Sequence, residues 1–316
     1  MRFAKGHGTG NDFVILPDYD GELELSAELV ARICDRHFGI GADGVLRVVR
    51  TAAVPAAAAE SAGAAGPAEA AVSAGVAVSA GVAVSAGDAA QAAEWFMDYR
   101  NADGSMAEMC GNGVRVFAKF LIDQGMAAGP ELPVATRSGT RTVRVAADGQ
   151  FTVDMGGAAV LSAGEVRAGD QLLAGLAISV GNPHLACMIS QPVTAVDLTA
   201  PSVLAPAELT GGANVEVVRI VGDHEIEMRV HERGSGLTLS CGTGAVAAAV
   251  AAAVSAGEWQ REEGLPWTVH VPGGTLSVSP SARASLLAGP AEIVASGELA
   301  GSFLAGLSPA ALASSS

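Results

Sequence analysis

The alternation of apolar and polar positions predicts β-strands along most of the chain. The opening stretch RFAKGHGTGNDFVIL, residues 2–16, alternates around a glycine-rich loop and predicts a strand, a loop and a second strand. The same alternation predicts a strand at 45–49 and a strand followed by a turn at 94–105. It also predicts pairs of strands at 134–156 (around Asp148-Gly149), 176–190, 213–236 and 267–279.

Three segments carry helical spacing instead. Ser26 is a favourable N-cap for apolar residues that run to Cys34. A second helix is expected in EMCGNGVRVFAKFL, residues 108–121, and is expected to end near Gln124. The third lies in LSCGTGAVAAAVAAAVSAG, residues 239–257, where alanine and valine occupy every side and predict a helix buried all round. Its apolar run is shorter than a bilayer span.

The second and third helices begin with the same cysteine–glycine corner. When Cys110 is aligned with Cys241, Gly111 falls on Gly242 and Gly113 on Gly244. Upstream of these corners, the segment TGNDF resembles VGNPH. This internal repeat predicts an α/β (α+β) fold with two pseudo-symmetric lobes, in which each lobe is a mainly antiparallel sheet wrapped around a central helix. The active site is expected in the cleft between the lobes.

The repeat also predicts the domain boundaries. The N-terminal lobe is expected to span residues 1–153 and the C-terminal lobe 154–287, with a return strand to the first lobe at 288–306 and a disordered tail at 307–316. Residues 51–93 are rich in Ala, Val, Ser and Gly and contain AVSAGVAVSAGVAVSAG, which has a period of six. A hexapeptide β-helix needs many coils and large apolar residues, so this segment is interpreted as a surface insertion without a catalytic role.

Composition limits which binding partners and which cellular compartment are expected for this protein. The formal net charge of -15 argues against nucleic acid and membrane surfaces as partners. The residues from Met1 to Leu16 contain no apolar signal region, and the four cysteines show no CxxC spacing, so a cytoplasmic protein with reduced thiols is expected. Cys34 and Cys187 lie among apolar residues and are expected to pack in the core.

The two cysteines are candidate catalytic groups because each is expected at the N-terminus of a helix. A thiolate at a helix N-terminus is stabilised by the helix dipole, so the thiol pKa is expected to fall from about 8.5 toward neutrality. Flanking glycines leave backbone N–H groups open to an anion. Two such corners facing each other would supply a base on one face of a carbon and an acid on the other, so that a stereocentre is inverted without a cofactor or metal.

Several motifs together resemble the diaminopimelate epimerase family. They are KGHGTGNDFVIL, DRHFGIGADGV, NADGSMAEMCGNGVR, GNPH and ERGSGLTLSCGTGA, and they extend the resemblance from Met1 to about Val294 around the alanine-rich insertion. The resemblance implies interconversion of LL- and meso-2,6-diaminopimelate without pyridoxal phosphate, on the route to lysine and peptidoglycan. It also implies a homodimer.

The resemblance assigns roles residue by residue. Cys110 and Cys241 would be the catalytic acid and base. Glu232 would bind an ammonium group, Arg233 would bind the distal carboxylate, and His184 would lie behind the substrate contacts. The remaining substrate-binding residues implied are Asn11, Asn101, Gly111, Asn112, Asn182, Asn214, Gly242 and Thr243. Gly44 departs from relatives that carry glutamine there, which puts a substrate contact at this position in doubt.

Three other functions remain open on the sequence alone. A proline racemase-type enzyme would use the same cysteine pair on a cyclic substrate. A zinc or redox protein could gather Cys110, Cys241, His184 and Glu232, although structural zinc sites usually have closely spaced ligands. A non-catalytic amino-acid binder would need no reactive thiols.

Overall fold

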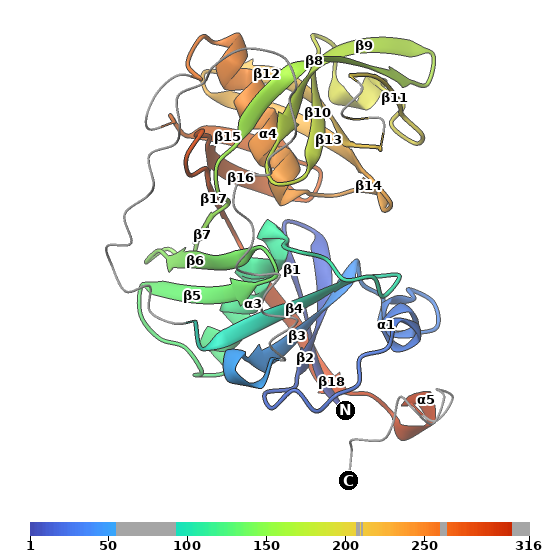
Figure 1. Ribbon diagram of the computed structural model, residues 1–316, viewed down its shortest axis with the longest axis vertical. Helices are drawn as coiled ribbons and strands as arrows, with labels where there is room; N and C mark the ends of the chain where they lie inside the picture. Colours follow the sequence, from blue (N-terminus) through green and yellow to red (C-terminus); the bar gives the residue numbers. More distant parts are fainter. Residues whose placement is uncertain (55–92, 207–208, 210, 260–263, 305–316) are drawn as a thin grey trace, which may run out of the picture.

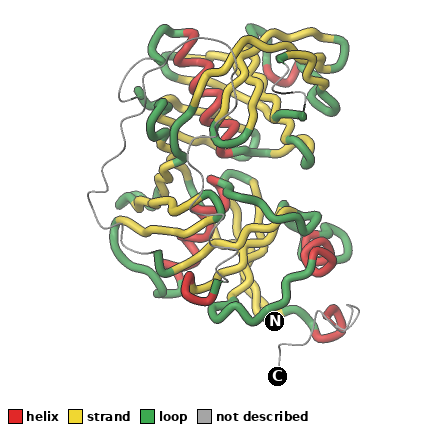
Figure 2. The backbone as a smooth tube through the Cα atoms, in the orientation of Figure 1, coloured by secondary structure: helices red, strands yellow, loops and turns green. Residues whose placement is uncertain are grey.

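The structure is a computed structural model that describes residues 1–54, 93–206, 209, 211–259 and 264–304. Most of the segment predicted as an insertion and the whole predicted tail therefore lie outside the described residues. The chain forms two lobes stacked along the long axis of the molecule (Figure 1), and strands far outnumber helices (Figure 2).

The first lobe is built mainly from the N-terminal half. Its sheet runs continuously in the order β18-β1-β2-β3-β4-β5-β6-β7, with parallel pairing only at β2–β3 and β4–β5. The bounds are β1 Arg2–Gly8, β2 Asn11–Pro17, β3 Gly44–Arg50, β4 Trp95–Asn101, β5 Glu131–Thr136, β6 Gly139–Val145, β7 Phe151–Asp154 and β18 Glu292–Glu298. Helix α3, Gly111–Asp123, lies inside this lobe and helix α1, Ala27–Cys34, lies outside it.

The second lobe repeats this pattern. Its sheet runs β8-β9-β10-β12-β13-β15-β16-β17, and the parallel pairs are again the third and fifth in order, β10–β12 and β13–β15. The bounds are β8 Ala159–Ala168, β9 Gln171–Ser179, β10 Pro183–Met188, β12 Asn214–Gly222, β13 Glu225–Glu232, β15 Trp267–Val271, β16 Gly274–Ser279 and β17 Leu286–Gly289. Helix α4, Gly242–Ser255, occupies the place of α3.

Short elements complete the described chain. Strand β11, Ser202–Ala205, pairs with β8, and β14, Gly236–Thr238, pairs with β13. The 3-10 turns η1 and η3 span Thr51–Ala53 and Val193–Ala195, and α5 spans Gly301–Leu304. No helix within the described residues has the length and apolar character needed to cross a bilayer.

Each half of the chain gives its last strand to the other lobe. Strand β8 follows β7 but pairs with β9 in the second lobe, while β18 follows β17 but pairs with β1 in the first. Strands β7 and β17 pair with each other where the chain crosses, which makes one continuous 18-stranded sheet. The predicted two-lobed α/β fold is confirmed. The domain boundaries given above stay a prediction.

The central helices differ because their surroundings differ. In α4, eleven residues are buried, almost all of them alanine and valine, as its uniformly apolar sequence predicted. Alanine has the highest helix propensity and makes the helix thin enough for a sheet to close around it. Helix α3 carries larger core residues, Phe117, Phe120 and Leu121, and keeps Lys119 toward solvent.

One prediction of strand number was wrong. Residues 134–156 were expected to form two strands around Asp148-Gly149, but they contribute to three, β5, β6 and β7. The additional turn falls at Arg137-Ser138, and Gly139 after it has φ of 90°, which is a conformation that glycine adopts without strain.

Candidate active site

The two cysteines occupy equivalent positions at the beginning of the central helices. Cys110 is the N-cap of α3 and Cys241 is the N-cap of α4, both with extended backbone. In each case the sulfur accepts a hydrogen bond from the amide of the third helical residue, Gly113 N or Gly244 N, at 3.4 Å. Serine, threonine, aspartate and asparagine usually fill this capping role, so the two sulfurs replace a hydroxyl or carboxylate oxygen.

The two helix N-termini meet across the interface between the lobes. A Cβ atom built on Gly242 would lie 3.2 Å from Gly111 Cα, so the two glycines pack closely against each other across the interface. The first turn of each helix leaves backbone N–H groups without an acceptor in the helix. Two sets of such groups, together with the positive ends of both helices, therefore point at one region.

A buried polar network ties the lobes together beside the cysteines. Thr9 Oγ1 and Ser240 Oγ lie 2.8 Å apart, and Asn112 Nδ2 donates to Asn11 Oδ1, Ser240 O and Ser240 Oγ at 3.2 Å each. Ser240 directly precedes Cys241, and Asn112 lies two residues after Cys110. These bonds fix the two cysteine corners relative to each other.

On the first lobe, Cys110 Sγ contacts Asn11 Oδ1 at 3.5 Å. The amide nitrogen of Asn11 donates to Asp43 Oδ2 at 2.7 Å. A carboxylate can only accept there, so this bond holds the Asn11 oxygen toward the sulfur.

Arg115 is the other polar group behind Cys110. It is fully buried, and its guanidinium donates to Asn112 Oδ1 at 2.9 Å and to the carbonyl of Pro290 at 3.3 Å. Burial lowers the pKa of Arg115 to about 10, although the neighbouring Cys110 opposes this shift. The group therefore stays cationic at neutral pH.

On the second lobe, a series of hydrogen-bonded side chains begins at Cys241. The Cys241 sulfur lies 3.5 Å from Thr243 Oγ1, which accepts from Asn182 Nδ2 at 3.3 Å. Asn182 Oδ1 contacts His184 Nε2 at 2.9 Å, and His184 Nδ1 contacts Glu216 Oε1 at 2.7 Å. His184 and Glu216 are both fully buried.

Glu232 lies beside Cys241 at the end of β13. It accepts a hydrogen bond from Thr238 Oγ1 at 2.5 Å. Burial raises the pKa of the Glu232 carboxyl, and hydrogen bonds with Thr238 and Cys241 oppose that shift. Glu232 therefore places an ionisable oxygen next to one of the two sulfurs.

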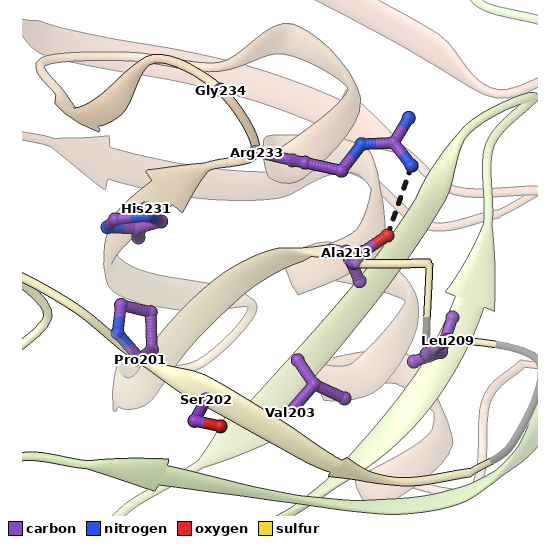
Figure 3. Close-up of a pocket in the computed structure, with 9 residues that line it drawn as sticks. Pro201, Ser202, Val203, Leu209, Ala213, His231, Arg233 and Gly234 are labelled. Atoms are coloured by element: carbon purple, nitrogen blue, oxygen red, sulfur yellow. Dashed lines mark hydrogen bonds between the residues drawn. The ribbon is translucent and has the colours of Figure 1, made fainter.

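Asn214 and Arg233 meet behind this group. Asn214 Oδ1 accepts from the Arg233 backbone amide at 2.8 Å. The exposed Arg233 guanidinium donates to the carbonyls of Gly211 and Gly212 and, within the described residues, has no acidic partner. Arg233 lines a cavity of about 320 Å³ together with His231 and Ser202. Figure 3 shows these side chains, with the Arg233 guanidinium extending toward Ala213.

Asn101, a predicted substrate contact, and Gly44 lie outside the hydrogen bonds that surround the two cysteines. Asn101 ends β4, and its amide donates to Ser105 Oγ at 3.0 Å in a partly exposed turn. It pairs with Gly44 on β3. A Cβ at Gly44 would lie 2.5 Å from Arg100 O and 2.7 Å from the Tyr99 ring, so the close packing of β4 requires glycine here.

The predicted lowering of the thiol pKa was wrong for the substrate-free protein. Burial raises the pKa of Cys110 to about 11 and that of Cys241 well above its ordinary value. The backbone amides at the helix N-termini and the Thr243 hydroxyl oppose these shifts, but the loss of solvation outweighs them. Nearby Glu232 raises both values further.

This direction predicts how Cys110 reacts with alkylating agents. A thiol with a raised pKa is protonated below that pKa, so only its small thiolate fraction reacts at neutral pH. Iodoacetamide labelling of Cys110, followed by mass spectrometry, should speed up about tenfold per pH unit from pH 7 to 10. Free cysteine measured in parallel should level off near pH 9. A Cys110 rate that is already constant at pH 8 would contradict the raised pKa.

The other two cysteines are structural, as predicted. Cys34 and Cys187 are buried, and burial raises the pKa of each to about 12. All four cysteines are free thiols. Sequence reasoning missed Thr9, Asp43, Arg115, Glu216 and Ser240. Of these, Glu216 was signalled by the single charge in the stretch NVEVV, and Arg115 by a charge at the start of a core helix.

Comparisons with known proteins identify the family of this chain. The family model described as diaminopimelate epimerase matches residues 3–161 and 176–294. A protein named diaminopimelate epimerase from Thermobifida fusca is 52% identical over 95% of this chain and 98% of its own length. One of the same name from Mycobacterium tuberculosis is 47% identical over 95% of this chain and 97% of its own.

Solved structures with low sequence identity share the fold. A probable proline racemase from Agrobacterium radiobacter has a TM-score of 0.60 at 13% identity, covering 98% of this chain and 95% of that one. A hydroxyproline epimerase from Agrobacterium vitis has a TM-score of 0.59 at 12% identity, covering 94% and 91%. With the family model matching both lobes and close relatives covering nearly the whole length, this chain belongs to the diaminopimelate epimerase family.

Proposed function

We propose that this protein interconverts LL- and meso-2,6-diaminopimelate by a two-base reaction between Cys110 and Cys241. The observation that carries the proposal is the meeting of two cysteine-capped helix N-termini, one from each lobe, at a single interface. A single nucleophilic cysteine would need one such corner. Inversion of a stereocentre needs two, one on each side of the carbon.

In the reaction, the thiolate of one cysteine removes the α-proton from one face of the substrate carbon. The C–H bond breaks, an S–H bond forms, and the electron pair stays on the carbon and its carboxylate. The thiol of the other cysteine then delivers its proton to the opposite face, which completes the inversion and leaves the two sulfurs with exchanged roles. Reaction in the reverse direction uses the same steps.

The developing negative charge is stabilised by the two helix N-termini. Backbone amides of Gly111, Asn112, Gly242 and Thr243 are proposed to hold the α-carboxylate, where both helix dipoles favour an anion. The α-ammonium group, attached to the carbon that lies between the sulfurs, would offset the desolvation that raises the thiol pKa values. A cofactor is not required by this scheme.

The proposed specificity rests on the second charged end of the substrate. The Arg233 guanidinium is exposed and, among the residues that the structure describes, donates to backbone carbonyls, so we propose that it takes the distal carboxylate. Asn214 fixes the backbone of this residue, and the neighbouring Glu232 supplies a site for an ammonium group. Asn11, Asn101 and Asn182 are proposed as further substrate contacts, and the assembly as a homodimer stays a prediction.

The test is deuterium exchange in D2O with diaminopimelate as substrate. The enzyme should introduce deuterium at the α-carbon, as measured by mass spectrometry, and should interconvert the two stereoisomers. L-proline under the same conditions should exchange at most slowly, because it has no distal carboxylate for Arg233. Exchange with proline and not with diaminopimelate would instead support a proline racemase-type function.

A further inference from the structure

Tyr99 is a buried residue of the first lobe whose hydroxyl has no partner among the residues that the structure describes. It lies on β4 in the core of this lobe, and 9% of its surface is exposed. Its backbone carbonyl accepts hydrogen bonds from Ala107 N and Arg137 Nη1, but the hydroxyl makes none within the described residues. The hydroxyl oxygen is not fully enclosed, so a ligand can reach it. Buried tyrosines usually bond their hydroxyl, which indicates a partner from outside the chain.

The hydroxyl end of the ring lies beside Gly44. A Cβ built on Gly44 would lie 2.7 Å from Tyr99 Cε2, which is bonded to the ring carbon that carries the hydroxyl. The ring therefore fills the space that a side chain at position 44 would need. Asp43, directly before this glycine, accepts a hydrogen bond from Asn11 at 2.7 Å, and Asn11 contacts Cys110. The hydroxyl end of Tyr99 is thus the end nearest the groups that contact the first cysteine.

The rest of the ring packs against side chains that also support the cysteine corner. The ring meets Phe13 edge-on with centroids 5.8 Å apart, and Tyr99 pairs with Leu46 between β4 and β3. A Cβ built on Gly113 would lie 3.6 and 3.3 Å from these two side chains. The Gly113 amide donates to Cys110 Sγ. The same apolar layer therefore holds the ring and the helix turn that carries the sulfur, which fixes one relative to the other.

The ionisable groups around the hydroxyl are acids. Burial raises the pKa of Tyr99 well above its ordinary value. Four acidic groups from both lobes raise it further through their charge: Cys110, Glu232, Asp43 and Cys241. Tyr99 therefore stays protonated and neutral and does not act as a third base. An oxygen with free lone pairs among acidic groups suits a positively charged hydrogen-bond donor.

The proposed reaction leaves one direction around the reacting carbon for such a donor. The hydrogen that moves lies on the line between the two sulfurs, and the other three substituents surround that line. The α-carboxylate is proposed to bind at the helix N-termini, and the substrate chain is proposed to extend toward Arg233. The remaining substituent is the ammonium group.

We propose that Tyr99 is a substrate-binding residue whose hydroxyl oxygen accepts a hydrogen bond from the ammonium group on the reacting carbon. This proposal rests on the function proposed above and deepens it. Because the ring is fixed by its packing, the bond orients the carbon between the two sulfurs without ordering a flexible side chain.

The decisive variant is Tyr99→Phe, which removes one oxygen and keeps the ring. KM for diaminopimelate should rise about 10- to 100-fold, the range expected for a hydrogen bond to a charged group. The value of kcat should stay within about threefold, because the ammonium group is bound equally before and during proton transfer. Unchanged KM, or a loss confined to kcat, would overturn the proposal.

The matched control is Tyr19→Phe. Tyr19 is the only other tyrosine of the chain, and its ring meets Trp95 edge-on at 5.6 Å with Arg50 above it at 5.9 Å. This variant should leave KM and kcat unchanged. Both variants should unfold at the temperature of the unmodified protein, since each retains its ring packing.

A spectroscopic measurement tests the contact in the unmodified protein. Tyrosine labelled with 13C at Cζ should give one NMR signal for each of the two tyrosines, assigned with the two variants. Diaminopimelate should move the Tyr99 signal and leave the Tyr19 signal in place. A Tyr99 signal that does not respond to diaminopimelate would contradict the proposed contact.

Pimelate separates the ammonium group from the carboxylates, because it has the same carbon chain and both carboxylates but no ammonium group. Its inhibition constant should be the same for Tyr99→Phe and for the unmodified enzyme. Inhibition by pimelate that weakens as much as diaminopimelate binding would show that Tyr99 does not recognise the ammonium group. Absence of deuterium exchange with diaminopimelate in the unmodified enzyme would instead overturn the proposed function.

Discussion

Replacing either Cys110 or Cys241 with alanine is expected to lower the epimerisation rate by about a thousandfold or more. Each sulfur is needed in every turnover, one to take a proton and the other to return it, and a positioned acid or base contributes about 10²–10⁴-fold. Alanine removes the sulfur while leaving the helix backbone in place. The rate is measured by stereoisomer separation with LL- and meso-diaminopimelate as separate substrates.

The other two cysteines provide the matched control. Cys34→Ala and Cys187→Ala remove the same atom from the core, where burial raises the pKa of both thiols and keeps them protonated. These variants should keep the rate within about threefold and lose about 1–2 kcal/mol of unfolding free energy from the small cavity. Turnover that survives in either Cys110→Ala or Cys241→Ala would rule out the two-base scheme.

Arg115→Met is expected to damage stability and rate together. Methionine keeps the approximate volume, but it leaves Asn112 Oδ1 and the Pro290 carbonyl without their donor inside the core. Buried acceptors without partners cost about 1–3 kcal/mol each, so with two of them the unfolding free energy should fall by about 2–6 kcal/mol in urea denaturation. The rate should fall about a hundredfold, because Asn112 loses the group that orients its amide and Cys110 loses a nearby cation.

Replacement of a surface arginine is the control, because it shows whether the loss of stability depends on the buried position of Arg115. Arg144 is more than half exposed and pairs with Glu131 at 2.8 Å, so Arg144→Met should change the unfolding free energy by less than about 0.5 kcal/mol. Labelling of Cys110 in Arg115→Met should also shift to higher pH, since the cation that favours its thiolate is gone. Unchanged stability and rate in Arg115→Met would show that the buried cation has no part in the site.

The repeat of the cysteine corner was sufficient to predict the two-lobed fold, because each corner precedes an apolar helix and follows a pair of strands. The alanine-rich run correctly predicted a helix buried on every side. A return strand to the first lobe was expected at 288–306, where β18 lies, but the matching exchange of β8 was not recognised, since alternation identifies strands and does not identify their partners. The turn at Arg137-Ser138 was missed because Gly139 was interpreted as part of a continuous strand.

Site residues that belong to a sequence motif were predicted. Site residues that are recognised only by their contacts in the folded chain were missed. Cys110, Cys241 and the glycines after them follow from their positions at helix ends. Glu216 contacts His184 across two strands, and Ser240 contacts Thr9 across the lobes, so only the folded chain brings these pairs together. The thiol pKa was predicted in the wrong direction because a helix terminus is visible in sequence and the depth of its burial is not.

The exchanged strands bear on how this chain arose and how it folds. If each half were a separate protein, β8 and β18 would be the terminal arms that two subunits swap, so the present chain has the topology of a swapped dimer joined into one chain. Arg2 of β1 pairs with Glu298 of β18, so one edge of β1 stays unpaired during synthesis until β18 has left the ribosome. A fragment ending before β18 would emerge with an open edge at β1, and aggregation of such truncated chains is the physical result.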